Sequence, residues 1–436
     1  MSAMATERAN DRHKRLARKT AREAREEYAA AAAYLRQRPD YHQVWDYFLE
    51  IIGQPLSPAL VRERTGRPVV EHLCNQAPLE IFHALGLQPL RLASGCCAVS
   101  RLADAALPAL MCPLLRSALG METLDTCEDE ENPAVSGHIS EIRIIPTTCD
   151  WTVKFAELAA GLPSPPAHFL EVPHLRHSER GQMRFQEELF LLIEALEAKS
   201  GRRLRRAALV ASVDLYMGAW ALFEDFLALR RDGRLPAVWF TVICGAFLAD
   251  TVENWVAAAR PLLAYLQTQE MRPPTKAVFL CGSPILFPNL KLLRLIEEAG
   301  MYVAADDLCA SERLWPGGLR IDDRSFSGLV RALAGRYHRA CQCPTFADNE
   351  RRFNSIRISS PSPDGLPYGP PNGRPGGIVH HVLKGCHPFD IASLGLERQA
   401  RQAGIPFIRI ETEYSPEDGR TILTRLEAFA NIVQGG

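Results

Sequence analysis

The sequence predicts an α/β protein with two doubly wound, mostly parallel sheets and a helical segment between them. Short β-branched and aliphatic runs alternate with amphipathic helical patterns in two stretches, and a stretch that is helical throughout divides them. The chain has 436 residues, of which 47% are apolar, which suits two or three domains. We expect a helical extension at 1–60, Rossmann- or flavodoxin-like domains at 61–180 and 273–436, and the helical segment at 181–272.

The N-terminal part carries mixed charge and an alanine run, "AREAREEYAAAAAYLRQ" (21–37). This pattern is typical of a helix that is either solvated or in contact with a partner. In the first α/β stretch three runs have the composition of buried strands. They are "LQPLRLA" (87–93), "EIRIIPTTCD" (141–150) and "HFLEVP" (168–173).

The middle of the chain is amphipathic, as in "RFQEELFLLIEALEAKS" (184–200), and therefore predicts long helices. The strand–helix rhythm then returns, interrupted by a Pro/Gly-rich segment at 359–377 that we expect to be a surface excursion. The strands expected here are "AVFLCGSP" (277–284), "MYVAADDLC" (301–309), "GIVHHVLKGC" (377–386) and "PFIRIETEY" (406–414), with helices at 289–300, 325–336 and 391–403.

Charge and composition exclude several classes of protein. The formal net charge is −1, so no electrostatic attraction to nucleic acid or to an anionic membrane is indicated. No run of eighteen apolar residues occurs, and the basic N-terminus lacks the apolar stretch of a secretory signal. We therefore expect a cytoplasmic protein, in which the twelve cysteines stay reduced and serve metal binding or catalysis rather than disulfides.

Several cysteines stand where a predicted strand ends or a predicted helix begins. Cys149, Cys281, Cys309 and Cys386 each close or follow a predicted strand. The carboxyl ends of parallel strands meet at one edge of a sheet, where ligands bind, so these distant residues are expected to converge there. Cys112 precedes Pro113 at a predicted helix start, where a thiolate is stabilised.

The spacing of the cysteines narrows the choice of metal. No C-x-x-C pair occurs, which removes zinc ribbons and ferredoxin-like runs. Thiols gathered from distant strand ends fit an iron–sulfur cluster, although buried inert cysteines give the same pattern. The sequence also lacks H-E-x-x-H, G-x-G-x-x-G, G-x-x-x-x-G-K-[ST] and G-x-S-x-G motifs, so hydrolase, kinase and dinucleotide-binding functions have no support.

Six segments in this order resemble the 2-hydroxyacyl-CoA dehydratase and benzoyl-CoA reductase family of iron–sulfur proteins, over roughly residues 65–434. The segments are "APLEIFHALGLQPLRL" (77–92), "MCPLLRSALG" (111–120), "TTCDW" (147–151), "GSPILFPNLKLLRLIEEAGMYVAADDLCASERLW" (282–315), "KGCHPFD" (384–390) and "GIPFIRIETEYSPEDGRTILTRLEAF" (404–429).

The resemblance implies a cofactor and its ligands. In the family three recurrent cysteines, matched here by Cys112, Cys149 and Cys386, hold a [4Fe-4S] cubane with one iron site open to substrate, hydroxide or water. Further cysteines make the chain look most like the double-cubane branch, in which one subunit carries an [8Fe-9S] cluster. The residues expected for the second cubane are Cys74, Cys97 (or its neighbour Cys96) and Cys309.

The resemblance also implies partners. Family members receive low-potential electrons from a separate ATP-hydrolysing activator with its own iron–sulfur cluster, and they work as homodimers or as heterodimers with a related subunit. The implied activity is reduction or dehydration of an acyl-CoA or a small molecule. The alternative is a non-catalytic electron-transfer or cluster-storage protein on the same fold.

His387 stands where many relatives have aspartate, and His387 and Glu80 are the expected catalytic proton donors, with Asp150 and Asp307 as further options.

Overall fold

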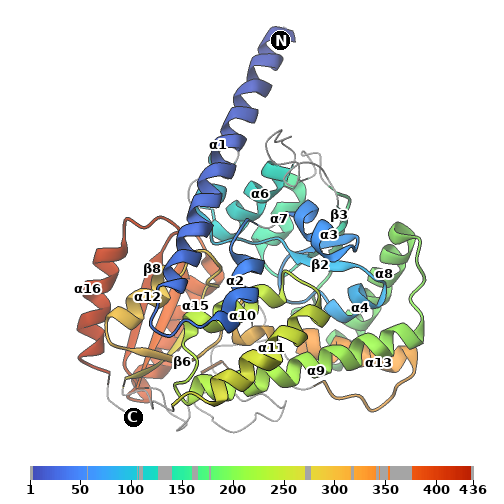
Figure 1. Cartoon of the computed structure of the whole chain (residues 1–436). Helices are drawn as coiled ribbons and strands as arrows, with labels where there is room; N and C mark the ends of the chain where they lie inside the picture. The colour runs from blue at the N-terminus through green and yellow to red at the C-terminus, as the bar shows by residue number, and fades with distance from the viewer. Residues whose placement is uncertain are drawn as a thin grey trace.

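The computed structural model shows two four-stranded sheets surrounded by helices (Figure 1). The predicted fold class is therefore confirmed. The domain boundaries remain predictions. The structure describes residues 3–55, 57–105, 107, 111–125, 140–159, 165–175, 178–270, 276–315, 319–339, 343, 352–353 and 376–433. Most of the Pro/Gly-rich segment 359–377 lies outside these residues, as do Cys127 and Cys341.

The first sheet has the strand order β2-β1-β3-β4, with all neighbours parallel. Its central strands are buried along most of their length, because helices cover both faces. The chain crosses between strands through α4, then through α5 and α6, and then through α7. The bounds are β1 Val69–His72, α4 Leu79–Ala84, β2 Gln88–Arg91, α5 Cys97–Leu102, α6 Pro113–Asp125, β3 Ser140–Pro146, α7 Asp150–Ala159 and β4 Ala167–Leu170.

The second sheet repeats this order as β6-β5-β7-β8, again with parallel neighbours. In each sheet the first and third strands of the unit lie side by side in the centre, so the chain reverses its direction of travel between them. Ligands of doubly wound sheets bind at this position. The bounds are β5 Ala277–Gly282, α12 Lys291–Glu298, β6 Tyr302–Asp306, α13 Phe326–Ala334, β7 Gly377–Leu383, α15 His387–Gln402, β8 Phe407–Thr412 and α16 Gly419–Ala430.

Four helices lie between the two units in the sequence, and two of them, α8 and α9, pack against both units. Helix α9 contacts α4 of the first unit and β6 of the second. It is also the one helix of the described chain long and apolar enough to cross a membrane, but Val213, Trp220 and Phe223 are fully buried in the core, as expected of a core helix. The bounds are α8 Glu179–Ser200, α9 Arg206–Arg231, α10 Ala237–Phe247 and α11 Val252–Gln267.

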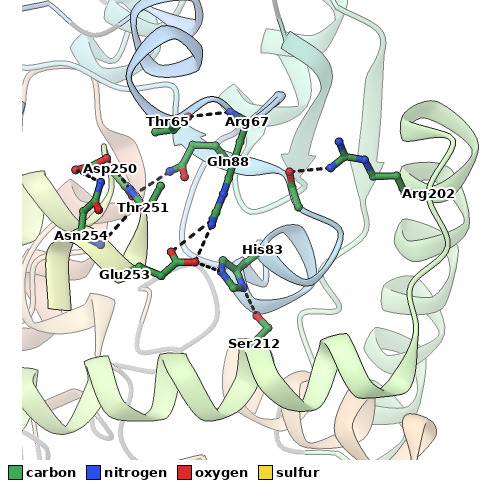
Figure 2. A network of polar contacts seen from close by, with 11 residues as sticks. Thr65, Arg67, His83, Gln88, Arg202, Ser212, Asp250, Thr251, Glu253 and Asn254 are labelled. Atoms are coloured by element: carbon green, nitrogen blue, oxygen red, sulfur yellow. Dashed lines mark hydrogen bonds and ion pairs between the residues drawn. The ribbon is translucent and has the colours of Figure 1, made fainter. Parts of the chain in front are cut away.

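A polar network joins these helices to the first unit (Figure 2). His83 on α4 lies between Ser212 of α9, at 2.9 Å, and Glu253 of α11, at 3.0 Å. Arg67 donates to the same Glu253 carboxylate at 2.7 Å. Burial opposes the charge of Glu253, but hydrogen bonds from Arg67 and His83 prevail and lower its pKa to about 2. The ionised Glu253 carboxylate therefore holds α11, α4 and the segment of Arg67 together.

The N-terminal helix α1 (Ala3–Arg36) projects from the body of the molecule (Figure 1). Its second half is not merely solvated, because Ala24, Tyr28 and Leu35 are buried, and α1 packs on α5. The alanines of the predicted helix thus form a contact face on which two helices approach closely. The helices α2 (Asp46–Ile52) and α3 (Pro58–Thr65) lead from α1 into the first sheet.

Candidate iron–sulfur site

Three cysteines each directly precede a helix. Cys112 precedes α6, Cys149 precedes α7 and Cys386 precedes α15. Their carbonyls accept the first helical hydrogen bonds, as in Arg116 N to Cys112 O at 3.1 Å and Asp390 N to Cys386 O at 3.1 Å. The positive end of a helix dipole stabilises a thiolate or an anionic ligand. Backbone N–H groups in the first turn of each helix accordingly oppose the rise in pKa that burial causes at these thiols.

These three cysteines interact with one another. A hydrogen bond between Cys112 and Cys386 lowers the pKa of the Cys112 thiol and raises that of Cys386. Burial raises the pKa of Cys149, and the charges of Cys343 and Cys386 add to that effect. The structure thus brings thiols from both α/β units to one place, as the strand-end argument predicted for Cys149 and Cys386.

Equivalent ends of the two units face each other around these sulfurs. Trp151, which follows β3, donates its indole N–H to the Gly385 carbonyl, which follows β7, at 3.3 Å. The Trp151 ring also stacks on His387 at 6.1 Å between centroids. Gly385 has φ +85°, a conformation that glycine adopts without strain, and this turns the chain into Cys386.

Cys74 and Cys309 form a second group beside the first. The Thr148 hydroxyl and Cys74 Sγ are joined by a 3.1 Å hydrogen bond. Burial raises the pKa of Cys74, and the nearby charges of Cys149 and Cys309 raise it further. Among the described residues, Cys74 is the one non-glycine residue with positive φ, at +52°. Such strain is typical of functional positions.

Arg91 holds Cys309 from the opposite unit. Its guanidinium donates to Cys309 Sγ at 3.1 Å and to the Cys309 carbonyl at 2.9 Å. Asn75 donates to the same carbonyl at 2.7 Å. Arg91 ends β2 and Cys309 follows β6, so equivalent strands of the two units again meet.

Cys97 has different neighbours. It begins α5, and its backbone N–H donates to Glu27 Oε2 at 2.8 Å. Burial raises its pKa, and the charges with the largest influence belong to Arg101, Glu27, Glu413 and Lys291 rather than to other cysteines. Cys97 lines a groove of about 1030 Å³ that also reaches Pro113 beside Cys112. Cys96 is buried, and its pKa is raised by burial and by Glu27.

Cys281 and Cys244 lie outside the group. Cys281 is inside β5, where its sulfur contacts His380 Nδ1 at 3.1 Å, and burial raises its pKa. The sequence suggested a strand end for Cys281, but the strand continues to Gly282 and turns the side chain into the sheet's own core. Cys244 is buried in α10.

The expected proton donors lie in different surroundings. His387 is exposed at the first turn of α15, stacked on Trp151. Glu80 is fully buried and accepts a 2.6 Å hydrogen bond from the Tyr337 hydroxyl, with Arg336 3.8 Å away. Asp307 accepts from Arg352 at 2.7 Å and from Gly282 N at 3.0 Å. Asp150 is exposed as the first residue of α7.

The donor set fits an iron–sulfur group. Within the described ranges, no three His, Cys, Asp or Glu side chains enclose a point where a single metal ion would bind. Thiols beside several helix N-termini are instead the donors that a larger, anionic iron–sulfur group requires. The buried hydroxyl of Tyr414 adds an unsatisfied donor at the same edge of the second sheet.

Several residues around the sulfurs escaped the sequence analysis. The Ser283 hydroxyl hydrogen-bonds Cys386 and opposes the rise of its pKa, and it also accepts from Leu383 N at 2.9 Å. Arg91 and Thr148 contact sulfurs directly. A usable signal was present, because Ser283 and Arg91 stand at strand ends just as the cysteines do. The strand-end rule therefore applies to hydroxyl and guanidinium groups as well as to thiols.

Comparisons with known proteins identify the family of the chain. The family model described as "2-hydroxyglutaryl-CoA dehydratase, D-component" matches residues 74–433. An Escherichia coli K12 protein named as a dehydratase subunit, YjiM, is 24% identical over 90% of this chain and 99% of its own.

Two further relatives have more specific names. The (R)-phenyllactyl-CoA dehydratase beta subunit of Clostridium sporogenes is 23% identical over 88% of this chain and 96% of its own. A benzoyl-CoA reductase subunit of Thauera aromatica is 26% identical over 55% of this chain and 61% of its own. The family match covers the second sheet, the first sheet except β1 and all three helix-capping cysteines, and the chain therefore belongs to the 2-hydroxyglutaryl-CoA dehydratase D-component family, as a subunit of the dehydratase and reductase type.

Proposed function

We propose that Cys112, Cys149 and Cys386 hold a [4Fe-4S] cluster at which this subunit reduces or dehydrates its substrate. The observation that carries the proposal is the meeting of these three thiols, from three helix starts and both α/β units. The interaction between the Cys112 and Cys386 thiols, each of which shifts the pKa of the other, supports it, because the ligands of one cluster must lie near one another.

The substrate class follows from the relatives. Two of them are named for phenyllactyl-CoA and benzoyl-CoA, so the proposed substrate is an acyl-CoA, with a small reducible molecule as the alternative. A low-potential cluster supplies single electrons to such a substrate. The protein's own contribution is to fix the sulfurs at helix N-termini, to add donors such as Ser283 and Arg91, and to shield the site from water.

We further propose that the electrons come from a separate ATP-hydrolysing activator with its own iron–sulfur cluster, in the cytoplasm. The sequence has no nucleotide-binding loop, so ATP hydrolysis belongs to the partner. Large apolar side chains are exposed on the two helices that begin at Cys149 and Cys386, namely Val153 (46%), Ile391 (70%) and Leu394 (66%). Exposed apolar residues beside a redox site suit a protein partner.

A second cubane in the same subunit, giving a double-cubane [8Fe-9S] cluster, is proposed at Cys74, Cys97 and Cys309. Its support is the contact of Cys74 with the first group through Thr148 and Cys149, together with the Arg91 contact to Cys309. Cys343 also influences Cys149 and competes with Cys97 as third ligand. The chain is proposed to function as a homodimer or beside a related protein, since both of the more specifically named relatives are described as subunits.

The test is anaerobic reconstitution with ferrous iron and sulfide, followed by iron quantification and EPR of the reduced protein. About four irons per chain indicate one cubane and about eight indicate two. Cys386→Ala is expected to lose most of the iron bound by the first cluster, because one of its three thiolates is gone. Cys244→Ala, a change at a fully buried cysteine of α10 outside the group, is the control and is expected to bind as much iron as wild type. Full iron content with an unchanged EPR signal in Cys386→Ala contradicts the assignment.

A further inference from the structure

Tyr414 lies at the same edge of the second sheet as the cysteines. It follows β8, which pairs in parallel with β7, and Cys386 follows β7. Its ring lines the groove of about 1030 Å³ that also touches Pro113, beside Cys112, and Lys384, beside Gly385. Tyr414 is therefore placed between the start of α6 and the start of α15.

The hydroxyl of Tyr414 lacks a hydrogen-bond partner in the described part of the chain. The residue is only 7% exposed, and its Oη is buried. Two buried tyrosines have partners, Tyr28 with Ser94 at 2.9 Å and Tyr337 with Glu80 at 2.6 Å, and half-buried Tyr302 donates to the Arg230 carbonyl at 2.8 Å. Because a buried hydroxyl without a hydrogen bond costs free energy, a group from outside the chain is expected to accept its hydrogen bond.

The backbone on both sides of Tyr414 is clamped. Lys291 Nζ donates to the carbonyls of Glu413 at 2.8 Å and Ser415 at 2.6 Å, and Asn289 donates to the Tyr414 carbonyl at 3.2 Å. These bonds fix the direction of the side chain. The buried hydroxyl is thus part of the folded arrangement rather than the end of a mobile loop.

Tyr414 is within electrostatic reach of thiols from both cysteine groups. Burial raises the pKa of Tyr414 well above its usual value, and the charges of Cys112, Cys309 and Cys386 raise it further. The hydroxyl consequently remains protonated and is able to donate. With no partner in the described part of the chain, the hydroxyl is able to donate to a group held by these cysteines.

We propose that the Tyr414 hydroxyl donates a hydrogen bond to the iron–sulfur group held by these cysteines, and that it is a positioning residue that favours the reduced form. The inference rests on the proposed function. A reduced cluster carries one more negative charge than the oxidised one, and a fixed donor stabilises that added charge.

The test compares Tyr414→Phe with wild type after anaerobic loading with ferrous iron and sulfide. The matched control is Tyr302→Phe, which removes a buried hydroxyl at the opposite edge of the same sheet. Tyr414→Phe is expected to bind as much iron as wild type, with a more negative midpoint potential in an EPR-monitored redox titration. Tyr302→Phe keeps the wild-type potential.

A second readout uses the protein without iron. Tyr414→Phe should then melt at or above the wild-type temperature, because the lost hydroxyl had no partner, whereas Tyr302→Phe melts lower. Wild type that binds no iron overturns the proposed function together with this inference. Wild type that binds iron while Tyr414→Phe retains its potential, or a Tyr414→Phe apoprotein as destabilised as Tyr302→Phe, overturns the role of Tyr414 alone.

Discussion

The two α/β units share one strand order but anchor their cysteines differently. In each unit the first and third strands are central, and a cysteine before a helix follows the third. Each unit also buries one arginine between two carboxylates. In the first unit that arginine belongs to the sheet, whereas in the second it comes from the helical segment.

The first of these triads, each an arginine with two carboxylates, holds a helix to its sheet. Arg143 of β3 is fully buried and pairs with Glu71 of β1 at 2.8 Å and with Glu122 of α6. Burial, and then the charge of Glu71, raise the pKa of Glu122 to about 8. Because α6 begins at Cys112, this triad fixes the helix that carries one proposed ligand.

The second triad holds a loop. Arg230 of α9 is fully buried and pairs with Asp306 at 2.7 Å and Glu312 at 2.8 Å. Asp306 also accepts from Leu308 N at 2.9 Å and from Ser311 Oγ at 2.6 Å, which shapes the loop that carries Cys309. The comparison shows that the triad positioning the helix after Cys112 lies within the first unit alone. The triad positioning the loop of Cys309 also requires the helical segment.

The largest expected effect is from Arg230→Met, which leaves two carboxylates buried without their cation. We expect a loss of about 3–5 kcal/mol in the free energy of unfolding. Hydrogen exchange should rise in α9 and in the loop at 306–312, while α6 keeps its protection. Arg143→Met is the matched variant, with increased exchange in α6 and β1 instead. Equal patterns in the two variants would contradict the separate anchoring of the units.

A smaller effect is expected where the units touch. A Cβ on Gly95 would stand 2.0 Å from the Leu286 carbonyl oxygen of the second unit, and Gly95 N donates to Phe287 O at 3.1 Å. Gly95→Ala therefore forces the units apart, at a cost of about 1–3 kcal/mol. Lower iron uptake with an unchanged far-UV circular dichroism spectrum is the expected result. The control is Gly218→Ala on α9, where a Cβ meets open space; iron uptake equal to the control would refute the prediction.

The smallest expected effect is a difference between the two triads in how they make stability depend on pH. The folded-state pKa of Glu122 is about 8 and that of Glu312, raised chiefly by burial, is about 7, against 4.5 for the ordinary group. The folded protein therefore holds protons that the unfolded chain has released, and stability falls as pH rises from 4.5 through these values.

Chemical denaturation at several pH values measures this loss. Glu122→Gln should flatten the slope up to about pH 8 and Glu312→Gln only up to about pH 7, because each amide replaces the protonated carboxyl. Between these two pH values the first-unit variant alone should differ from wild type in slope. A wild-type stability that rises with pH over this window would show that the carboxylates are ionised in the fold.

The sequence predicted seven of the eight strands, because alternation and β-branched runs are local signals. It missed β1, whose four residues "VVEH" include two polar side chains. Glu71 is buried there because Arg143, far along the chain, neutralises it. Such pairing is invisible in a local pattern. The same limit hid Arg230, which meets its partners only after the helical segment folds against β6.

For the candidate site, the strand-end rule selected Cys149 and Cys386 and the helix-start rule selected Cys112; their thiols interact in the fold, and their role as cluster ligands stays a prediction. The strand-end rule could not tell Cys309, held by Arg91 at a strand end, from Cys281, which the last residues of β5 turn inward. That distinction depends on the register of β5 against β7, where Cys281 stands opposite His380. Register is a property of the assembled sheet.

The repeated strand order has a consequence for assembly in time. Each sheet is built from strands that lie close in the sequence, so contacts within a sheet form more readily than contacts between the two units. Cys149 and Cys386 belong to different units, and Arg91 reaches Cys309 only across the junction. The thiols therefore meet last. In a newly made chain the cysteines are at first separate. Loading with iron and sulfide therefore indicates that the two units have docked.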